Sequence, residues 1–380
     1  MSRVYLDHNA TTPLREEARR ALVATIEEGL GNPSSSHTRG RAARAHVDDA
    51  RARVAAALGV LESEVVFTSG ATEANNLALC GAARALGPGS TLITSRIEHP
   101  SVIEPLEALA RDGLVLNALG VDSRGHLDPG EVLEACERAA GPVLLSLGIA
   151  NGEVGSVAPL DELARMGLGE RTTLHVDGAQ ALGRLPLALV DWGVSLASFS
   201  AHKVGGPPGV GVLVRRANAP LEPLLRGGGQ EAELRAGTEN VPSIVSAAIA
   251  VELAVAEQET YLERTGAQVR LLCEEVGMKL PAARQLGPDP DTPRLPNTVN
   301  FEIEGHDGRV LVARLDLEGL EASAGSACAS GSLEPSPVLL ALGLDRERAR
   351  SGVRLSVGRT TTTEDIYTAV EILRRTTAGA

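Results

Sequence analysis

Residues 65–76 contain a short motif, Val65-Val66-Phe67-Thr68-Ser69-Gly70-Ala71-Thr72-Glu73-Ala74-Asn75-Asn76, from which the fold can be worked out. Residues 65–68 are an apolar run of the length of a buried strand, Gly70 marks a turn, and residues 72–84 have the pattern of a helix. The N–H groups at such a helix start, with the Thr72 hydroxyl, could bind a phosphate group. Thr72 could equally cap the helix without any ligand.

The same strand-and-helix unit recurs through residues 40–260. Further strands are predicted at residues 91–94, 143–147, 173–176, 196–199 and 210–214, and a further helix at residues 101–111. Strands that alternate with helical segments predict an α/β fold with a mostly parallel central sheet and helices on both faces. Such sheets bind ligands at the carboxyl ends of their strands.

The rest of the chain predicts a second, smaller α/β domain. With 380 residues the chain is too long for one simple core. Residues 242–270 predict one helix that connects the two domains. After it, we expect a surface loop at residues 288–296, strands at 300–303 and 353–356, and helices at 306–319 and 363–376. We expect a large domain over residues 14–258 and a small domain over residues 259–380 that also includes the N-terminal segment 1–13.

Charge and composition exclude several classes of protein. There are 36 Lys and Arg against 49 Asp and Glu, a net charge of −13, which disfavours direct binding of nucleic acid and suits small molecules or basic protein partners. No apolar run approaches the roughly 20 residues that span a bilayer, and the N-terminus lacks an apolar signal region. We therefore expect no membrane contact and a cytoplasmic location, where the four cysteines are thiols.

Lys203 follows a predicted strand in Ser198-Phe199-Ser200-Ala201-His202-Lys203 and precedes Gly205-Gly206-Pro207-Pro208-Gly209. A phosphate-binding P-loop is excluded, because there the Lys follows the glycines and precedes Ser or Thr. Most lysines at the end of a strand are surface residues. A lysine against tightly packed Gly- and Pro-rich chain can instead form an imine, which needs a partly desolvated amine.

Two further polar residues end predicted strands. Asp177, in His175-Val176-Asp177-Gly178-Ala179-Gln180, could cap a helix or pair with the protonated pyridine nitrogen of pyridoxal phosphate. The 26 residues from Asp177 to Lys203 fit one further helix and strand, so both could converge from neighbouring strand ends. His99, in Glu98-His99-Pro100, is a structural residue or a group that stacks on a cofactor and transfers protons.

Cys328 differs from the other three cysteines. Cys80, Cys136 and Cys273 each lie in a helical pattern and are interpreted as packing residues. Cys328 lies in Ser323-Ala324-Gly325-Ser326-Ala327-Cys328-Ala329-Ser330-Gly331-Ser332, where small residues predict an accessible loop. It is either a harmless linker cysteine or a nucleophile that hands a group to another protein.

Taken in order and spacing, these five clusters resemble the cysteine desulfurases, a branch of the class V aminotransferase-like, fold-type I pyridoxal-phosphate enzymes. The resemblance runs nearly from end to end. It includes Tyr5-Leu6-Asp7-His8-Asn9-Ala10-Thr11-Thr12-Pro13, Gly31-Asn32-Pro33-Ser34-Ser35-Ser36-His37, Leu333-Glu334-Pro335-Ser336 and Val353-Arg354-Leu355-Ser356-Val357-Gly358-Arg359. The Gly-Ser-Ala-Cys loop is similar to that of the subgroup serving iron–sulfur cluster assembly and tRNA thiolation.

The resemblance implies a role for each site residue. Lys203 would hold pyridoxal 5′-phosphate covalently and shuttle protons, Asp177 would pair with its pyridine nitrogen, and His99 would stack on its ring and act in acid–base steps. Gln180 would contact the ring hydroxyl. The remaining implied cofactor-binding residues are Ala71, Thr72, Asn151, Ser200 and His202, and Thr238, which would reach the phosphate bound to the neighbouring subunit of a homodimer.

The resemblance also implies the reaction. Arg354 would pair with the carboxylate of L-cysteine, with Asn32 as a second substrate-binding residue. Cys328 would attack the substrate's sulfur, release L-alanine and carry a persulfide to an acceptor protein. No metal is implied. The acceptor stays open among iron–sulfur scaffolds, tRNA-modifying enzymes, DNA phosphorothioation and thiocofactor synthesis.

One position departs from the family pattern. Where the family has Asn-Asn-Glu, this chain has Asn151-Gly152-Glu153, and Gly152 lacks the side chain that normally touches the ring hydroxyl and the substrate. Asn151, Gln180 or water could compensate, or the enzyme could be slow or altered in substrate. A transaminase or lyase of the same fold, a selenocysteine lyase, and a degenerate scaffold that only binds partners are the alternatives.

Overall fold

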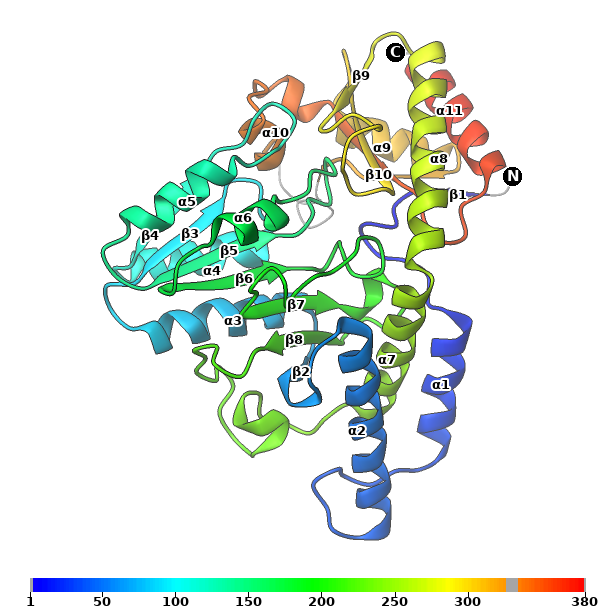
Figure 1. Cartoon of the computed structure of the whole chain (residues 1–380). Coiled ribbons are helices and arrows are strands. Elements are labelled where there is room, and N and C mark those ends of the chain that lie inside the picture. Colours follow the sequence, from blue (N-terminus) through cyan, green and yellow to red (C-terminus); the bar gives the residue numbers. More distant parts are fainter. Residues whose placement is uncertain (1–2, 326–333, 379–380) are drawn as a thin grey trace.

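The computed structural model describes residues 3–325 and 334–378. Its largest sheet has seven strands in the order β2-β8-β7-β6-β5-β3-β4 (Figure 1). Neighbouring strands are parallel except at β8, which is antiparallel to both β2 and β7. The strands are β2 (Val65–Thr68), β3 (Thr91–Ser95), β4 (Val115–Leu119), β5 (Val143–Gly148), β6 (Thr172–Asp177), β7 (Leu196–Ser200) and β8 (Gly211–Arg215).

Helices cover both faces of this sheet. Helices α3 (Ala71–Leu86) and α4 (Pro100–Arg111) pack on one face, and α5 (Pro129–Arg138) and α6 (Leu160–Met166) on the other. In Figure 1, α3 lies below the sheet and α5 and α6 lie above it. Successive residues of a strand point to opposite faces, so Leu144 joins the apolar cluster of α3 and α4 whereas Leu145 joins the cluster that contains α5 and α6. Burial on both faces explains the nearly continuous apolar runs in the sequence.

The predicted single helix over residues 242–270 is wrong. The structure has two helices, α7 (Val241–Ala256) and α8 (Gln258–Lys279), bent by 69° at the break between them. The bend arises because α7 packs against α1 (Glu16–Glu27) and α2 (Thr38–Leu58), whereas α8 packs against α11 (Thr363–Ala378). Within the described ranges no single helix is long and apolar enough to cross a membrane, although α7 and α8 together pass that test as a bent pair.

A second apolar cluster lies at the C-terminal half of the chain and includes the N-terminal residues Val4 and Leu6. Strand β1 (Val4–Tyr5) pairs in parallel with β11 (Leu320–Glu321), and β12 (Gly352–Ser356), β10 (Thr298–Ile303) and β9 (Ala283–Leu286) form an antiparallel sheet. Helices α9 (Gly308–Leu317), α10 (Pro337–Ala341) and α11 complete this part, at the upper side of Figure 1. The domain boundary between residues 258 and 259 stays a prediction.

One expectation about the region between Asp177 and Lys203 is also wrong. Strand β7 is present, but residues 178–195 form turns and not the expected helix. These turns connect the end of β6 to the start of β7. Within them, Gly183 adopts a left-handed backbone conformation (φ +65°), which glycine allows without steric cost. Asp177 and Lys203 are nevertheless at the ends of neighbouring strands, because β6 and β7 pair directly.

Candidate active site

The carboxyl ends of five strands, β2, β3, β5, β6 and β7, open into one cavity of about 450 Å³. A volume of this order suits a small molecule or cofactor. Residues after each strand line the cavity, and the N-terminal segment and β12 close its other side. The cavity therefore lies where parallel sheets bind ligands, as the sequence predicted.

Lys203 reaches this cavity from the 3-10 turn Ala201–Lys203 that follows β7. Its amine donates hydrogen bonds to the carbonyl oxygens of Asn9 and Ala10, the latter at 2.9 Å. The glycines that follow are required: Gly205 has φ +87°, and a Cβ atom on Gly206 would lie 2.8 Å from that of Ala201. The tight chain places the amine against the cavity wall.

Asp177 ends β6 at the base of the same cavity and is only 8% exposed. Its Oδ1 accepts from the backbone N–H of Ala179 at 2.9 Å, so it stabilises the turn that follows the strand. Its Oδ2 accepts from the amide of Asn75 at 2.8 Å. Asn75 is fully buried in α3 and holds the carboxylate in one orientation.

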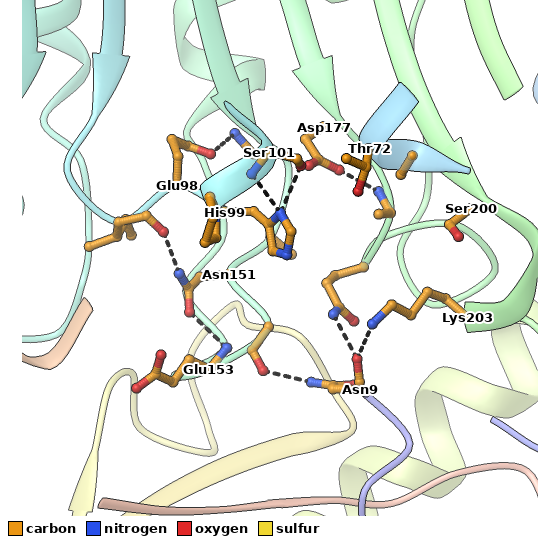
Figure 2. Close-up of a pocket in the computed structure, with 18 of the residues that line it drawn as sticks. Asn9, Thr72, Glu98, His99, Ser101, Asn151, Glu153, Asp177, Ser200 and Lys203 are labelled. Atoms are coloured by element: carbon orange, nitrogen blue, oxygen red, sulfur yellow. Dashed lines mark hydrogen bonds between the residues drawn. The ribbon is translucent and has the colours of Figure 1, made fainter. Parts of the chain in front are cut away.

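His99 is the N-cap residue of α4 and lines the cavity between Asp177 and Asn151 (Figure 2). Its Nδ1 accepts from the backbone N–H of Ser101 at 3.1 Å and lies 2.7 Å from the Ser101 hydroxyl oxygen. Because Nδ1 acts as an acceptor, a neutral His99 carries its proton on Nε2. The side chain is thus set up to donate or return a proton at that atom.

Glu98, next to His99, was not singled out from the sequence. Its two carboxyl oxygens accept from the Ser95 hydroxyl at 2.6 Å and from the Gly148 N–H at 2.7 Å. Burial, opposed in part by these two hydrogen bonds, raises the pKa of Glu98 to about 7. Through these two hydrogen bonds, Glu98 connects Ser95 at the end of β3 to Gly148 at the end of β5. In the sequence, only its place beside His99 could have drawn attention to it.

The cavity lining includes Ala71 and Thr72 at the start of α3 and Ser200 and His202 after β7. The N-terminus of a helix attracts anions through its N–H groups and its dipole. Burial, together with Lys203, lowers the pKa of His202 to about 4, so its imidazole is neutral near pH 7 and acts through hydrogen bonds.

Arg354 in β12 closes the opposite side of the cavity and is 3% exposed. One guanidinium nitrogen pairs with Asp7 at 2.7 Å, and Asp7 also accepts from the Ser323 hydroxyl at 2.8 Å. The Nε atom of Arg354 is buried and has no partner among the described residues. Buried donors without partners are rare in proteins, which points to a ligand at this place.

The departure at Gly152 has a structural counterpart. A Cβ atom on Gly152 would lie 2.6 Å from the amide nitrogen of Gln180, so the Gln180 side chain occupies the space of a side chain at position 152. Asn151 does not take over, because its amide donates to Ile97 and accepts from the N–H groups of Glu153 and Val154. Gln180 is the residue that fills this part of the cavity wall.

Two predicted site residues are not brought to the cavity by this chain. Asn32 and Thr238 are exposed and do not line it. Asn32 instead accepts from the N–H of Ser34 at 2.8 Å. Cys328 lies outside the described residues. The other cysteines lie in helices α3, α5 and α8 as free thiols, as predicted.

Comparison with known proteins identifies the family. The model of the aminotransferase class V family matches residues 4–368. The chain belongs to the aminotransferase class V family. It is 40% identical over 373 residues to the cysteine desulfurase IscS of Dictyoglomus turgidum, which covers 98% of this chain and 94% of that protein. The chain is therefore an enzyme of the cysteine desulfurase group, and the resemblance stated from its motifs is confirmed.

Solved structures extend the comparison to the fold. A NifS-like protein superimposes with a TM-score of 0.92 at 34% identity, covering all of both chains. A structure described as SspA in complex with cysteine gives a TM-score of 0.79 at 31% identity, covering 93% of this chain and 98% of that one. The α/β fold predicted from the sequence, that of the fold-type I pyridoxal-phosphate enzymes, is confirmed.

Proposed function

We propose that this chain is a cysteine desulfurase that binds pyridoxal 5′-phosphate on Lys203 and transfers the sulfur of L-cysteine to Cys328 as a persulfide, with release of L-alanine. The observation that carries the proposal is the meeting of the Lys203 amine and the Asp177 carboxylate in one cavity, from the ends of two paired strands. The same cavity is lined by His99 and by a helix N-terminus.

The residues present fit this cofactor. Its aldehyde requires an amine, its pyridine nitrogen an acid, and its phosphate a set of donors, and the cavity offers Lys203, Asp177 and the start of α3 for these three groups. A second observation is that the chain contains only two lysines, Lys203 and Lys279. Lys279 ends α8 and pairs with Glu275, so Lys203 is the one lysine at the cavity.

When bound, pyridoxal phosphate supplies an aldehyde carbon for an amine and an electron-withdrawing pyridinium ring. Asp177 would hold the proton of the pyridine nitrogen, and its own orientation is fixed by Asn75. Ala71, Thr72, Ser200 and His202 would hold the phosphate. Lys203 and the Nε2 atom of His99 would move protons, since both groups lie at the cavity.

Substrate binding would involve Arg354, whose buried Nε has no partner among the described residues. A guanidinium group binds a carboxylate through two parallel hydrogen bonds, which would orient the amino acid. Asp7 would keep Arg354 in place. The similarity to SspA, whose structure is in complex with cysteine, supports cysteine as the substrate.

Sulfur transfer would take place at Cys328. The thiol sulfur of Cys328 forms a bond to the sulfur of L-cysteine, the carbon–sulfur bond of the substrate breaks, and its Cβ gains a proton. The products are L-alanine and a Cys328 persulfide, with no external oxidant or reductant. The persulfide would pass to an acceptor protein in iron–sulfur cluster assembly, tRNA thiolation or DNA phosphorothioation.

A homodimer would complete the site. Thr238 and Asn32 do not line the cavity of their own chain, and in the proposed dimer Thr238 would reach the phosphate bound to the other subunit. Direct nucleic-acid or membrane contact is not part of the proposal. A cytoplasmic location suits the chemistry, because the reaction needs a reduced thiol.

The test is the conversion of L-cysteine by the purified protein. Wild-type protein should form L-alanine and sulfide in the presence of a thiol reductant. The Cys328→Ser variant should keep the cofactor absorbance and lose this product, whereas Cys80→Ser should behave as wild type. Product formation by the Cys328→Ser variant would contradict the role of Cys328.

A further inference from the structure

Arg184 is a buried cation without a carboxylate partner. It is 3% exposed and makes no ion pair with any residue in the described ranges. Instead it donates to four neutral oxygens, which belong to the side chains of Asn9 (2.7 Å) and Gln180 (2.6 Å) and to the backbone of His8 (3.3 Å) and Lys203 (3.0 Å). Buried charges in proteins are normally paired, so this one calls for an explanation.

The groups around Arg184 do not supply a negative charge near neutral pH. Burial raises the pKa of Tyr261 and lowers the pKa of His8 and of His202 to about 4, so all three are neutral. The other basic side chains around it, Lys203, Arg354 and Arg359, supply no negative charge either. Of the carboxylates nearby, Asp7 pairs with Arg354, Glu257 with Arg15, and Asp177 accepts from Asn75 and Ala179.

Arg184 also determines which end of the Gln180 amide faces the cavity. A guanidinium can only donate, so the atom of Gln180 that lies 2.6 Å from Arg184 must be the oxygen. The amide nitrogen is then on the cavity side, where it donates to the Asn9 carbonyl at 3.1 Å and keeps a second N–H group. Without Arg184 the amide could turn and present its oxygen instead.

We propose that Arg184 is a positioning residue that fixes the amide of Gln180 with its N–H toward the bound cofactor and supplies the positive charge for the cofactor's anionic ring oxygen. The inference rests on the proposed binding of pyridoxal phosphate at Lys203. It explains why a cation is buried among neutral oxygens: the anion that balances it arrives with the cofactor. It also gives Gln180 the role that a side chain at position 152 cannot take.

The proposal is tested by the visible absorbance of the cofactor-loaded protein. The colour change follows loss of the proton that Lys203 and the bound cofactor share. This loss makes the site more negative, and a nearby cation stabilises the more negative state. Removal of the charge in Arg184→Gln or Arg184→Met should therefore raise the pH midpoint of the colour change by about one unit, equivalent to a tenfold change in the equilibrium. Arg184→Lys, which keeps the charge, should restore most of the wild-type midpoint.

A matched control is Arg294→Gln. Arg294 is also buried and also donates to backbone carbonyls, including that of Val154. Neither arginine lines the cavity itself, but among the described residues Arg294, unlike Arg184, donates to no side chain that does. This variant should lose stability as Arg184→Gln does, with no shift of the midpoint. In a Gln180→Ala background the shift caused by Arg184→Gln should become smaller, because the amide that transmits the effect is gone.

The outcomes separate the inference from the proposed function. An unchanged midpoint in both neutral Arg184 variants, with the cofactor bound, would overturn the role of Arg184 and leave the proposed function intact. A shift of the same size in Arg294→Gln would also overturn it, since the effect would then follow from lost stability. If wild-type protein showed no cofactor absorbance at all, the proposed function itself would fall.

Discussion

The Nδ2 atom of Asn75 lies 2.8 Å from Oδ2 of Asp177 and 2.9 Å from the hydroxyl oxygen of Ser101. That hydroxyl lies 2.7 Å from Nδ1 of His99. One buried amide on α3 therefore connects the two residues proposed to bind the cofactor ring, although they follow different strands. Asn75 sets the orientation of both.

We expect Asn75→Ala to weaken cofactor binding. The substitution removes a hydrogen bond to a charged group, which typically contributes about 1.5–3 kcal/mol, and frees the Asp177 carboxylate to turn. Affinity for pyridoxal phosphate should fall about tenfold or more, measured by titration of the apoprotein and by the cofactor's absorbance. Asn117→Ala, an exposed position on β4, should bind as wild type. Equal affinity in both variants would contradict the role of Asn75.

Gly152→Asn should destabilise the protein, although the family has asparagine at this position. The new Cβ would lie 2.6 Å from the Gln180 amide nitrogen, which must move and give up its contacts with Asn9 and Arg184. Overpacking of this kind costs about 1–3 kcal/mol, measurable as a lower free energy of unfolding. Gly152→Asn combined with Gln180→Ala should recover much of the loss. If the single variant were as stable as wild type, the space at position 152 would be larger than the structure indicates.

Asp7→Ala should raise KM for L-cysteine by about tenfold or more, with a smaller effect on kcat. Asp7 holds one nitrogen of Arg354 at 2.7 Å, and a charge-assisted hydrogen bond of this kind contributes about 1.5–3 kcal/mol. Its loss leaves the guanidinium free to adopt orientations that do not bind the carboxylate. Steady-state kinetics with Asp122→Ala, an exposed position, as control checks this. A lowered kcat with unchanged KM would indicate that Asp7 acts elsewhere.

His175 makes the stability of the fold depend on pH. It is fully buried between the hydroxyls of Ser146 and Ser198, and burial lowers its pKa to about 4 from an ordinary value of 6.5. The unfolded chain therefore takes up a proton before the folded protein does, and stability is lost as pH falls from about 6.5 toward about 4, by about 3 kcal/mol in total.

The corresponding measurement is the free energy of unfolding at a series of pH values. His175→Gln, which carries no titrating group, should be less stable at neutral pH but should lose less stability over this acid range. His306→Gln, at a partly exposed position, should keep the wild-type pH profile. An identical profile in His175→Gln and wild type would show that another group causes the acid sensitivity.

The sheet could be predicted because its strands are buried on both faces. Residues 65–68 and 143–147 are nearly continuous apolar runs, which are typical of strands covered on both faces. Strand β4 escaped prediction because it lies at the edge and is largely exposed, so its sequence, Val115–Leu119, has no such run. The bend between α7 and α8 escaped because both helices have helical patterns and only their packing partners differ.

The candidate site was predicted in part for a similar reason. Asp177 ends a strand, and Lys203 and His99 follow strands closely. Such polar residues are unusual there, so each stands out in the sequence. Asn75 and Arg184 lie within a helix and a turn and act through other side chains, so no local pattern distinguishes them. Asn9 lies 194 residues from Lys203, and only the folded chain brings its carbonyl to the amine.

The most direct test of the central claim is reduction of the purified holoprotein with borohydride, followed by mass mapping of its peptides. The chain has only two lysines, so the result is unambiguous. The mass of the reduced cofactor should be found on the peptide that contains Lys203, and the peptide that contains Lys279 should be unmodified. An unmodified Lys203 peptide, or the cofactor mass on Lys279, would contradict the account.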